Sequence, residues 1–354
     1  MDLIPIVEWI GDTQTTALAG LIVGIIFGIA AQRPRFCLRA ATVEFTSGVL
    51  GKRMAVWLLT FSTAVVWTQA AQYAGFFHSA DARMLAVPGS YSGAIIGGLI
   101  FGVGMVLARG CSGRLLVLAA TGNLRSVISG LVFAVVALMA LQGWLAPLRR
   151  TLAELWITPN GSNINLLDAL HLPNDSSIAV GLITAAIALY LAYKNHVGMQ
   201  VLFMASGVGF AVALGWVLTT ALVAISFDPV QIESATFTGP SAHTLMFFTS
   251  PNPVLDFDIG LIAGVFAGAF LATLCTKELQ FMGFESADNM KRAIIGAALM
   301  GMGGMLAGGC AIGAGVTGGS IFAATAWLAL FCMWIGAVIT SRIVDKQRPA
   351  TLSV

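Results

Sequence analysis

Long apolar segments separated by short polar ones occupy nearly the whole of this chain. Each is close to the roughly 20 residues that a helix needs to cross about 30 Å of hydrocarbon. Of the 354 residues, 58% are hydrophobic and 10% are charged, which is too little polar surface to cover a water-soluble globule. We therefore expect an all-α polytopic membrane protein with about nine transmembrane helices and no soluble catalytic domain. The expected spans are 14–32, 54–77, 91–109, 125–146, 177–193, 198–226, 257–275, 291–308 and 323–341.

Two segments of the chain are similar to each other. Aligned without gaps, residues 94–117 and 293–316 are identical at 11 of 24 positions. The shared residues include Cys111 and Cys310, and each cysteine follows a glycine in a break of the apolar pattern. Repeated, interrupted membrane segments indicate the substrate site of a transporter.

This similarity predicts two pseudo-symmetric halves. A weaker match between the glycine-rich segments 20–28 and 260–268 extends it. We expect a first repeat half at 14–146 and a second at 200–343. The connecting segment, 147–199, would hold one transmembrane helix.

The two breaks predict short re-entrant helices rather than full crossings. Backbone that is not helical at membrane depth is tolerated only where protein or a water-filled cavity satisfies its polar groups. Glycines next to a thiol would expose backbone N–H groups there, and a helix beginning just after the cysteine would direct its positive end to the same point, a geometry that binds anions. The candidate anion-binding glycines are Gly110, Gly113, Gly309 and Gly313.

A third cysteine, Cys37, follows Pro34 in a basic turn where we expect the first span to end. Arg35 beside it, and Arg109 beside Cys111, could attract an anion; both could instead extend to the lipid interface. Glu44 is either a salt-bridge partner of these arginines or a proton acceptor.

Basic residues gather at one set of span ends. The positive-inside rule assigns these ends to the cytoplasm, so the N-terminus would lie outside and the C-terminus inside. These residues are Arg33, Arg35, Arg39, Lys52, Arg53, Lys277, Lys291, Arg292, Arg342, Lys346 and Arg348.

The other residues with reactive side chains exclude several kinds of site. Five cysteines without a Cys-x-x-Cys pair fit neither a disulfide framework nor a four-cysteine zinc site. We interpret Cys275 and Cys332, in unbroken apolar runs, as packing residues. No histidine is in a catalytic arrangement, and His243 is expected at the surface. A net charge of +2 indicates no nucleic-acid partner.

The motifs Arg35-Phe36-Cys37, Arg109-Gly110-Cys111-Ser112-Gly113 and 308–313 (Gly-Gly-Cys-Ala-Ile-Gly) resemble those of the YeeE/YedE family of bacterial inner-membrane sulfur-compound transporters. The likeness extends over about 15–343. It implies thiosulfate uptake and a path lined by Cys37, Cys111 and Cys310. It also implies a possible cytoplasmic partner, a small sulfur-carrier protein of the TusA type.

The sequence thus predicts a transporter, without cofactor or metal, that imports thiosulfate or a similar small sulfur anion across the bacterial inner membrane. Thiols can donate weak hydrogen bonds to a sulfane sulfur and let it go again. A membrane sulfurtransferase that passes sulfane sulfur or selenium through a cysteine persulfide is the alternative. It lacks a clear general base near the cysteines. A carrier of soft metals such as Cu(I) is a third reading, weakened by the lack of Met or His clusters near the breaks.

Overall fold

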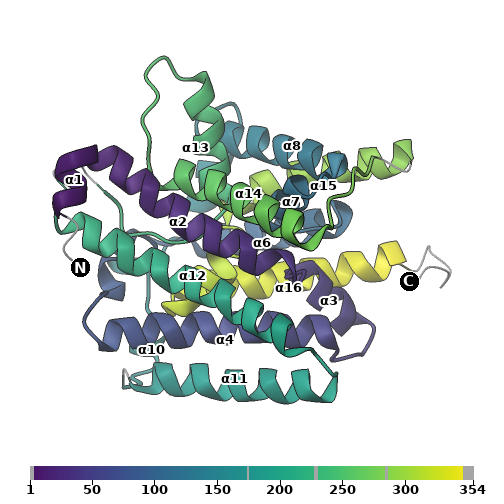
Figure 1. Cartoon of the computed structure of the whole chain (residues 1–354), viewed down its shortest axis with the longest axis horizontal. Coiled ribbons are helices and arrows are strands. Elements are labelled where there is room, and N and C mark those ends of the chain that lie inside the picture. The colour runs from purple at the N-terminus through teal and green to yellow at the C-terminus, as the bar shows by residue number, and fades with distance from the viewer. Residues whose placement is uncertain (1–3, 174, 227–229, 284–285, 346–354) are drawn as a thin grey trace.

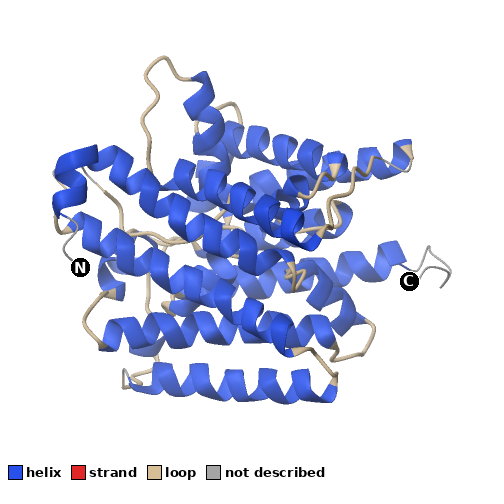
Figure 2. Ribbon diagram, in the orientation of Figure 1, coloured by secondary structure: helices blue, strands red, loops and turns tan. Residues whose placement is uncertain are grey.

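The computed structural model of the chain describes residues 4–173, 175–226, 230–283 and 286–345. Helices and the loops that join them make up this part, without a strand (Figure 2). Lys346 and Arg348, used above to orient the C-terminus, lie outside it. The helices and helical turns are α1 (Ile4–Ile10), α2 (Asp12–Gln32), α3 (Leu38–Thr46), α4 (Lys52–Tyr73), η1 (Ser79–Asp81), α5 (Arg83–Ala86), α6 (Tyr91–Leu107), α7 (Ser112–Ala120), α8 (Leu124–Leu141), α9 (Ala146–Glu154), η2 (Pro159–Gly161), α10 (Leu166–Ala169), α11 (Asp175–Lys194), α12 (Met199–Val223), α13 (Thr238–Thr249), α14 (Phe257–Thr276), α15 (Ala287–Leu306), η3 (Gly313–Gly318) and α16 (Ala324–Asp345).

Nine long helices lie where the nine spans were predicted. Eight segments of the described chain are helical, long and apolar enough to cross a membrane. The all-α polytopic class is therefore confirmed. The helix at the predicted span 291–308, α15, is not among these eight, because its first turns carry Asp288, Lys291 and Arg292. The long helices lie side by side with their axes roughly aligned, and α11 flanks α4 at one edge (Figure 1).

The helices α2 and α14 cross through glycines. Gly20 meets Phe257 and Gly28 meets Val265, so the two helices run in the same direction. A Cβ atom added at Gly24 would overlap the backbone of α14. Small residues let helix backbones approach this closely in lipid, where van der Waals packing holds helices together. The sequence predicted this packing role for both sets of glycines.

The segments that carry the sequence similarity, α6 and α15, also pack on each other. Gly97 lies against Gly303, and Gly104 lies against Gly296, so these helices run in opposite directions. Both stop four residues before a cysteine, at Leu107 and Leu306. The crossing therefore brings the two breaks into the same region of the bundle.

Several residues outside the breaks were predicted with alternatives that the structure now separates. Glu44 accepts a hydrogen bond from the backbone N–H of Met54, at 2.9 Å and at the start of α4. Among the described residues it does not pair with an arginine. Cys332 is buried in the core, whereas Cys275 is exposed on α14. The long segment between α12 and α14 contains α13.

Candidate functional site: three cysteines between two cavities

The two cysteine breaks have the same backbone course. In each, the residue two positions before the cysteine has a left-handed conformation, Arg109 with φ 59° and Gly308 with φ 76°. Glycine adopts this conformation freely, whereas a residue with a Cβ atom is disfavoured there by about 1–2 kcal/mol. The chain then reverses after α6 and after α15. Cys111 lies directly before the nine-residue helix α7, and Cys310 directly before the turn that leads into η3.

Cys37 reaches the same region from a third element. It is the residue that precedes α3, with extended backbone. Its Sγ lies 3.8 Å from the Sγ of Cys111, although 74 residues separate them in sequence. Both thiols are buried and free. The predicted path residues Cys37 and Cys111 are therefore direct neighbours.

The break at Cys310 packs on the break at Cys111. A Cβ atom added at Gly113 would lie 2.5 Å from Cδ1 of Ile312. It would also lie 3.1 Å from ring carbons of Phe237. Cys310 itself is fully buried, and its Sγ accepts the backbone N–H of Gly313 at 3.3 Å. All three cysteines thus belong to one buried cluster. Phe237 also belongs to this cluster, and the sequence analysis did not predict it as a site residue.

Of the four candidate glycines, Gly113 alone lies in the first turn of an α-helix. The first N–H groups of such a helix have no acceptor within it, and no side chain caps α7. The Oγ of Ser112 is buried and has no hydrogen-bond partner among the described residues. By contrast, the N–H of Gly110 donates to Met105 O and that of Gly309 to Gly304 O, at 3.1 and 2.9 Å. The N–H groups open to an anion are those at the start of α7.

A basic cavity of about 270 Å³ opens beside α7, where α2 and α14 end. It is lined by Arg35 and by Arg114, whose Nη1 has no partner among the described residues. Gln32 donates to the Glu278 carboxylate at 2.7 Å on the same wall. Arg114 was missed, although a charged residue three positions after Cys111 in an apolar segment is a usable signal. Arg109 points elsewhere, with Nη2 3.2 Å from Asn289 Oδ1.

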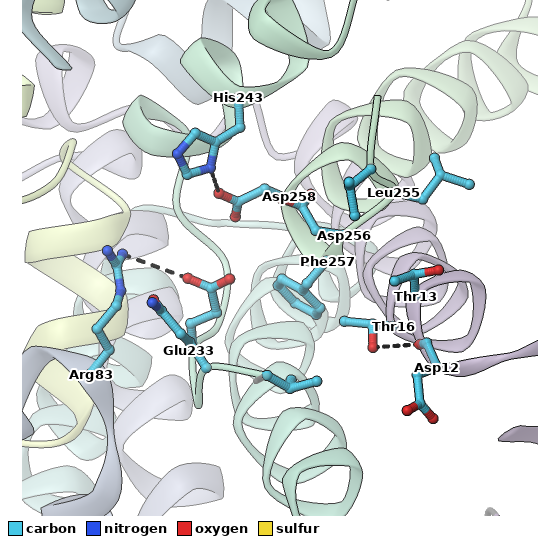
Figure 3. A pocket seen from close by; sticks show the side chains of 13 residues that line it. Asp12, Thr13, Thr16, Arg83, Glu233, His243, Leu255, Asp256, Phe257 and Asp258 are labelled. Carbon is cyan, nitrogen blue, oxygen red and sulfur yellow. Dashed lines mark hydrogen bonds and ion pairs between the residues drawn. The ribbon is translucent and has the colours of Figure 1, made fainter. Parts of the chain in front are cut away.

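A second cavity of about 590 Å³, which we call the vestibule, lies at the other ends of α2 and α14 (Figure 3). Its charged lining residues come from five elements and were not predicted as a site. His243 is one of them, and its side chain is 32% exposed. The charged and titratable lining residues are Asp12, Arg83, Glu233, His243, Asp256 and Asp258.

Residues 230–237, which we call the crossing segment, join the vestibule to the cysteine cluster. Glu233 lies in the vestibule, and Phe237 packs on Gly113 and on Phe27 at a ring-centroid distance of 5.1 Å. Between them, Ala235 O accepts a hydrogen bond from Thr317 of η3. The crossing segment is therefore held between the vestibule and both breaks.

The site has the character of a passage rather than of a catalytic centre. In the described part of the chain, no three His, Cys, Asp or Glu side chains are arranged to hold a metal ion. What the geometry offers is a row of soft, weakly hydrogen-bonding thiols with a helix N-terminus beside them. Several weak contacts in series suit an ion that must bind and leave.

Comparison with known proteins agrees with this reading. The chain is 26% identical to the thiosulfate transporter TsuA of Escherichia coli (strain K12), over 95% of this chain and 97% of that relative. It is 25% identical to the thiosulfate transporter TsuA of Spirochaeta thermophila, over 90% of this chain and 96% of the relative. The family model for sulphur transport matches residues 33–339. The chain belongs to the sulphur transport family, the family of membrane transporters that the three cysteine motifs indicated.

Proposed function

We propose that this protein takes up thiosulfate across the bacterial inner membrane along a path lined by Cys37, Cys111 and Cys310. The observation that carries the proposal is the 3.8 Å approach of the Cys37 and Cys111 thiols at the start of α7. The relatives named as thiosulfate transporters give the substrate.

The two ends of thiosulfate differ, and the site offers a group for each. The sulfonate end is charged and takes strong N–H or O–H donors, which the start of α7 and Ser112 provide. The terminal sulfur is a soft acceptor that suits the weak S–H donors of the cysteines. Because a thiol binds weakly, the ion can move from one cysteine to the next. Among the predicted glycines, Gly113 carries most of this role, and Gly110, Gly309 and Gly313 shape the breaks.

The direction of transport follows from the distribution of charge. Arg33 and Arg35 end α2, Lys277 follows α14, and Lys52 begins α4, all at the end of the bundle that holds the basic cavity. The positive-inside rule places this end in the cytoplasm. The vestibule would then face outward, the N-terminus would be periplasmic and the C-terminus cytoplasmic. Arg35 and Arg114 would receive the anion as it leaves the cysteines.

The two-halves hypothesis has support in the order of the elements. In 12–141 and in 199–345, a long helix, a short one, two long ones, a short element and a long one follow in turn, except that η1 and α5 stand between the two long helices of the first half. This order pairs α2 with α12, and α4 with α14, instead of pairing Gly20 with Gly260. It places Phe237, before α13, opposite Cys37, before α3. We keep the halves at 14–146 and 200–343, with 147–199 as the connecting segment.

A small TusA-like carrier would meet the transporter at the cytoplasmic end. The basic cavity opens there, so a carrier that takes sulfur from thiosulfate would find its substrate beside Arg35 and Arg114. Consumption of the ion on that side would draw further uptake.

The test is uptake of thiosulfate labelled separately at its two sulfur atoms, in cells without other thiosulfate importers. Wild type should accumulate both labels in equal amounts. Cys111→Ala should lower the rate about tenfold or more, since a hydrogen bond to a charged group contributes about 1.5–3 kcal/mol. Cys332→Ala, a buried cysteine outside the cluster, is the matched control and should keep the wild-type rate. Accumulation of the terminal sulfur alone would establish sulfur transfer instead, and full uptake by Cys111→Ala would falsify the thiol path.

A further inference from the structure

The vestibule presents a difficulty for an anion that must cross it. Four carboxylates line it, from Asp12, Glu233, Asp256 and Asp258, against one arginine and one histidine. With every carboxyl ionised and His243 protonated, the six groups sum to 2 − 4 = −2. Thiosulfate is a dianion, and like charges repel strongly in a partly buried cavity. The outer cavity of a thiosulfate path would thus oppose its own substrate.

One carboxylate of the vestibule is only half satisfied. The side chain of Asp258 is 6% exposed, and its Oδ2 lies 2.6 Å from Nδ1 of His243 (Figure 3). Its Oδ1 is buried without a hydrogen-bond partner among the described residues. A buried carboxylate oxygen in this state is costly unless a proton or a cation is nearby. His243 already pairs with the other oxygen, and its hydrogen bond to the Asp258 carboxylate raises the pKa of this histidine.

Glu233 is the vestibule carboxyl best placed to accept a proton. Its side chain is 17% exposed and lies 3.6 Å from Nη2 of Arg83. Burial raises the pKa of Glu233 to about 8, and the charges of Asp258 and Asp256 add to the increase. Arg83 acts in the opposite direction and does not cancel it. Burial also raises the pKa of Asp256.

The position of Glu233 connects this charge to the path. It lies on the crossing segment, four residues before Phe237, which packs on Gly113 beside the cysteines. An ion moving from the vestibule to the start of α7 along this segment would pass Glu233 first. The protonation state of Glu233 therefore sets the charge at the mouth of the path.

We propose that Glu233 is a proton-binding residue of the vestibule, and that its neutral form admits the thiosulfate anion to the cysteine path. The inference rests on the proposed uptake of thiosulfate. The proton comes from the outer solution and stays on the Glu233 carboxyl while the anion passes. Protonation removes one negative charge and also frees the Arg83 guanidinium from its carboxylate partner, so that Arg83 can pair with the incoming sulfonate. When Glu233 is ionised, Arg83 pairs with it again, and the carboxylates of the vestibule repel the anion.

The sign of the pH dependence follows. Glu233 is mostly neutral at pH 7 and mostly ionised at pH 9, so the admitting form falls about tenfold between these values when the pKa is about 8. Uptake should be steady below about pH 7 and should fall above it. In the alternative, a cationic His243 alone attracts the anion. Uptake would then fall as that imidazolium deprotonates, and it would do so in the presence or absence of the Glu233 carboxyl.

The experiment measures initial thiosulfate uptake in cells at external pH 6 to 9.5. Wild type should show the tenfold fall between pH 7 and 9. Glu233→Gln keeps the carboxyl's shape in a neutral form, so its rates at the two pH values should agree within about twofold. Glu154→Gln, an exposed carboxyl on α9, should keep the wild-type profile. Arg83→Gln removes the charge that lowers the pKa of Glu233, so its midpoint should move to higher pH even if its rate is reduced.

The outcomes separate the two proposals. A wild type that takes up no thiosulfate at any pH would overturn the proposed function. In that case infrared spectra of the purified protein still test Glu233, since wild type but not Glu233→Gln should lose a protonated-carboxyl band as pH rises through about 8. Uptake with a flat wild-type profile, or the same fall in Glu233→Gln as in wild type, would overturn the proton-binding role alone.

Discussion

The two cysteine breaks share their sequence and their backbone course, and yet they differ in chemistry. After Cys111 the chain forms a regular helix whose first N–H groups are uncapped and whose third residue is Arg114. After Cys310 it forms the turn η3, and every residue from 309 to 323 is buried. Gly313 there donates its N–H to the thiol itself. The first break thus offers an arginine and the N–H groups of Ser112 and Gly113, whereas the second is enclosed by buried residues on every side.

From this difference we expect the two breaks to have different roles in the proposed path. The first would bind the charged end of the anion, and the second would supply one further thiol and the apolar wall that closes the site. Ile312 is that wall, since its Cδ1 occupies the space that a side chain at position 113 would need. The two similar segments would then be complementary parts of the proposed path rather than equivalent ones.

The largest expected effect comes from oxidising the thiols. Cys37 and Cys111 lie 3.8 Å apart, and the S–S bond of a disulfide is about 2.05 Å, so a small shift joins them. Diamide would take up the two electrons and two protons of the thiols. We expect a Cys37–Cys111 cross-link, loss of uptake to background, and recovery on reduction with dithiothreitol.

Peptide mapping after oxidation sharpens the comparison between the breaks. Cys310 should remain a free thiol, because the close thiol–thiol contact among the described residues joins Cys37 to Cys111. Cys332→Ala should be cross-linked and inactivated as readily as wild type. A Cys111–Cys310 link in place of the expected one would contradict the separate roles given to the two breaks.

A smaller effect is expected from the contact between the breaks. In Gly113→Ala the added Cβ would lie 2.5 Å from Cδ1 of Ile312, and overpacking of this kind costs about 1–3 kcal/mol. We expect uptake to fall by about tenfold at an unchanged level of protein in the membrane. Ile312→Val removes the obstructing methyl group, so the double variant should recover part of the rate. At Gly110 the nearest atom is 3.4 Å away, so Gly110→Ala should stay within about twofold of wild type. Equal losses in the two alanine variants would show that the contact with Ile312 is not what matters.

The architecture could be predicted from sequence because each element is determined locally. The span 14–32 became Asp12–Gln32, and 257–275 became Phe257–Thr276, since apolar length alone specifies such helices. The glycines of α2 and α14 were assigned to close packing, and they form that contact. The breaks at Cys111 and Cys310 were visible as glycines that interrupt an apolar run.

The parts that could not be predicted depend on contacts between distant elements. Glu233, His243 and Asp258 meet in the vestibule from a loop, α13 and α14, and no spacing in the sequence relates them. The contact between Cys37 and Cys111 is of the same kind. Glu44 shows the limit for a single residue, because its capping of α4 depends on how the chain returns after α3.

The smallest effect we expect separates Arg114 from the other basic residues at the end of the bundle that holds the basic cavity. Arg114 lies on α7 and lines the basic cavity, with one guanidinium nitrogen buried and unpartnered among the described residues. Arg114→Gln should raise the half-saturating thiosulfate concentration about threefold to fivefold, the loss of roughly 1 kcal/mol of charge attraction. Arg114→Lys keeps the charge without the planar fork and should recover part of it. Lys52→Gln removes an exposed charge at the same end of the bundle, outside this cavity, and should leave the value unchanged. If both glutamine variants raise the half-saturating concentration equally, the net charge at this end of the bundle acts on the anion, and the position of Arg114 in the first break contributes nothing further.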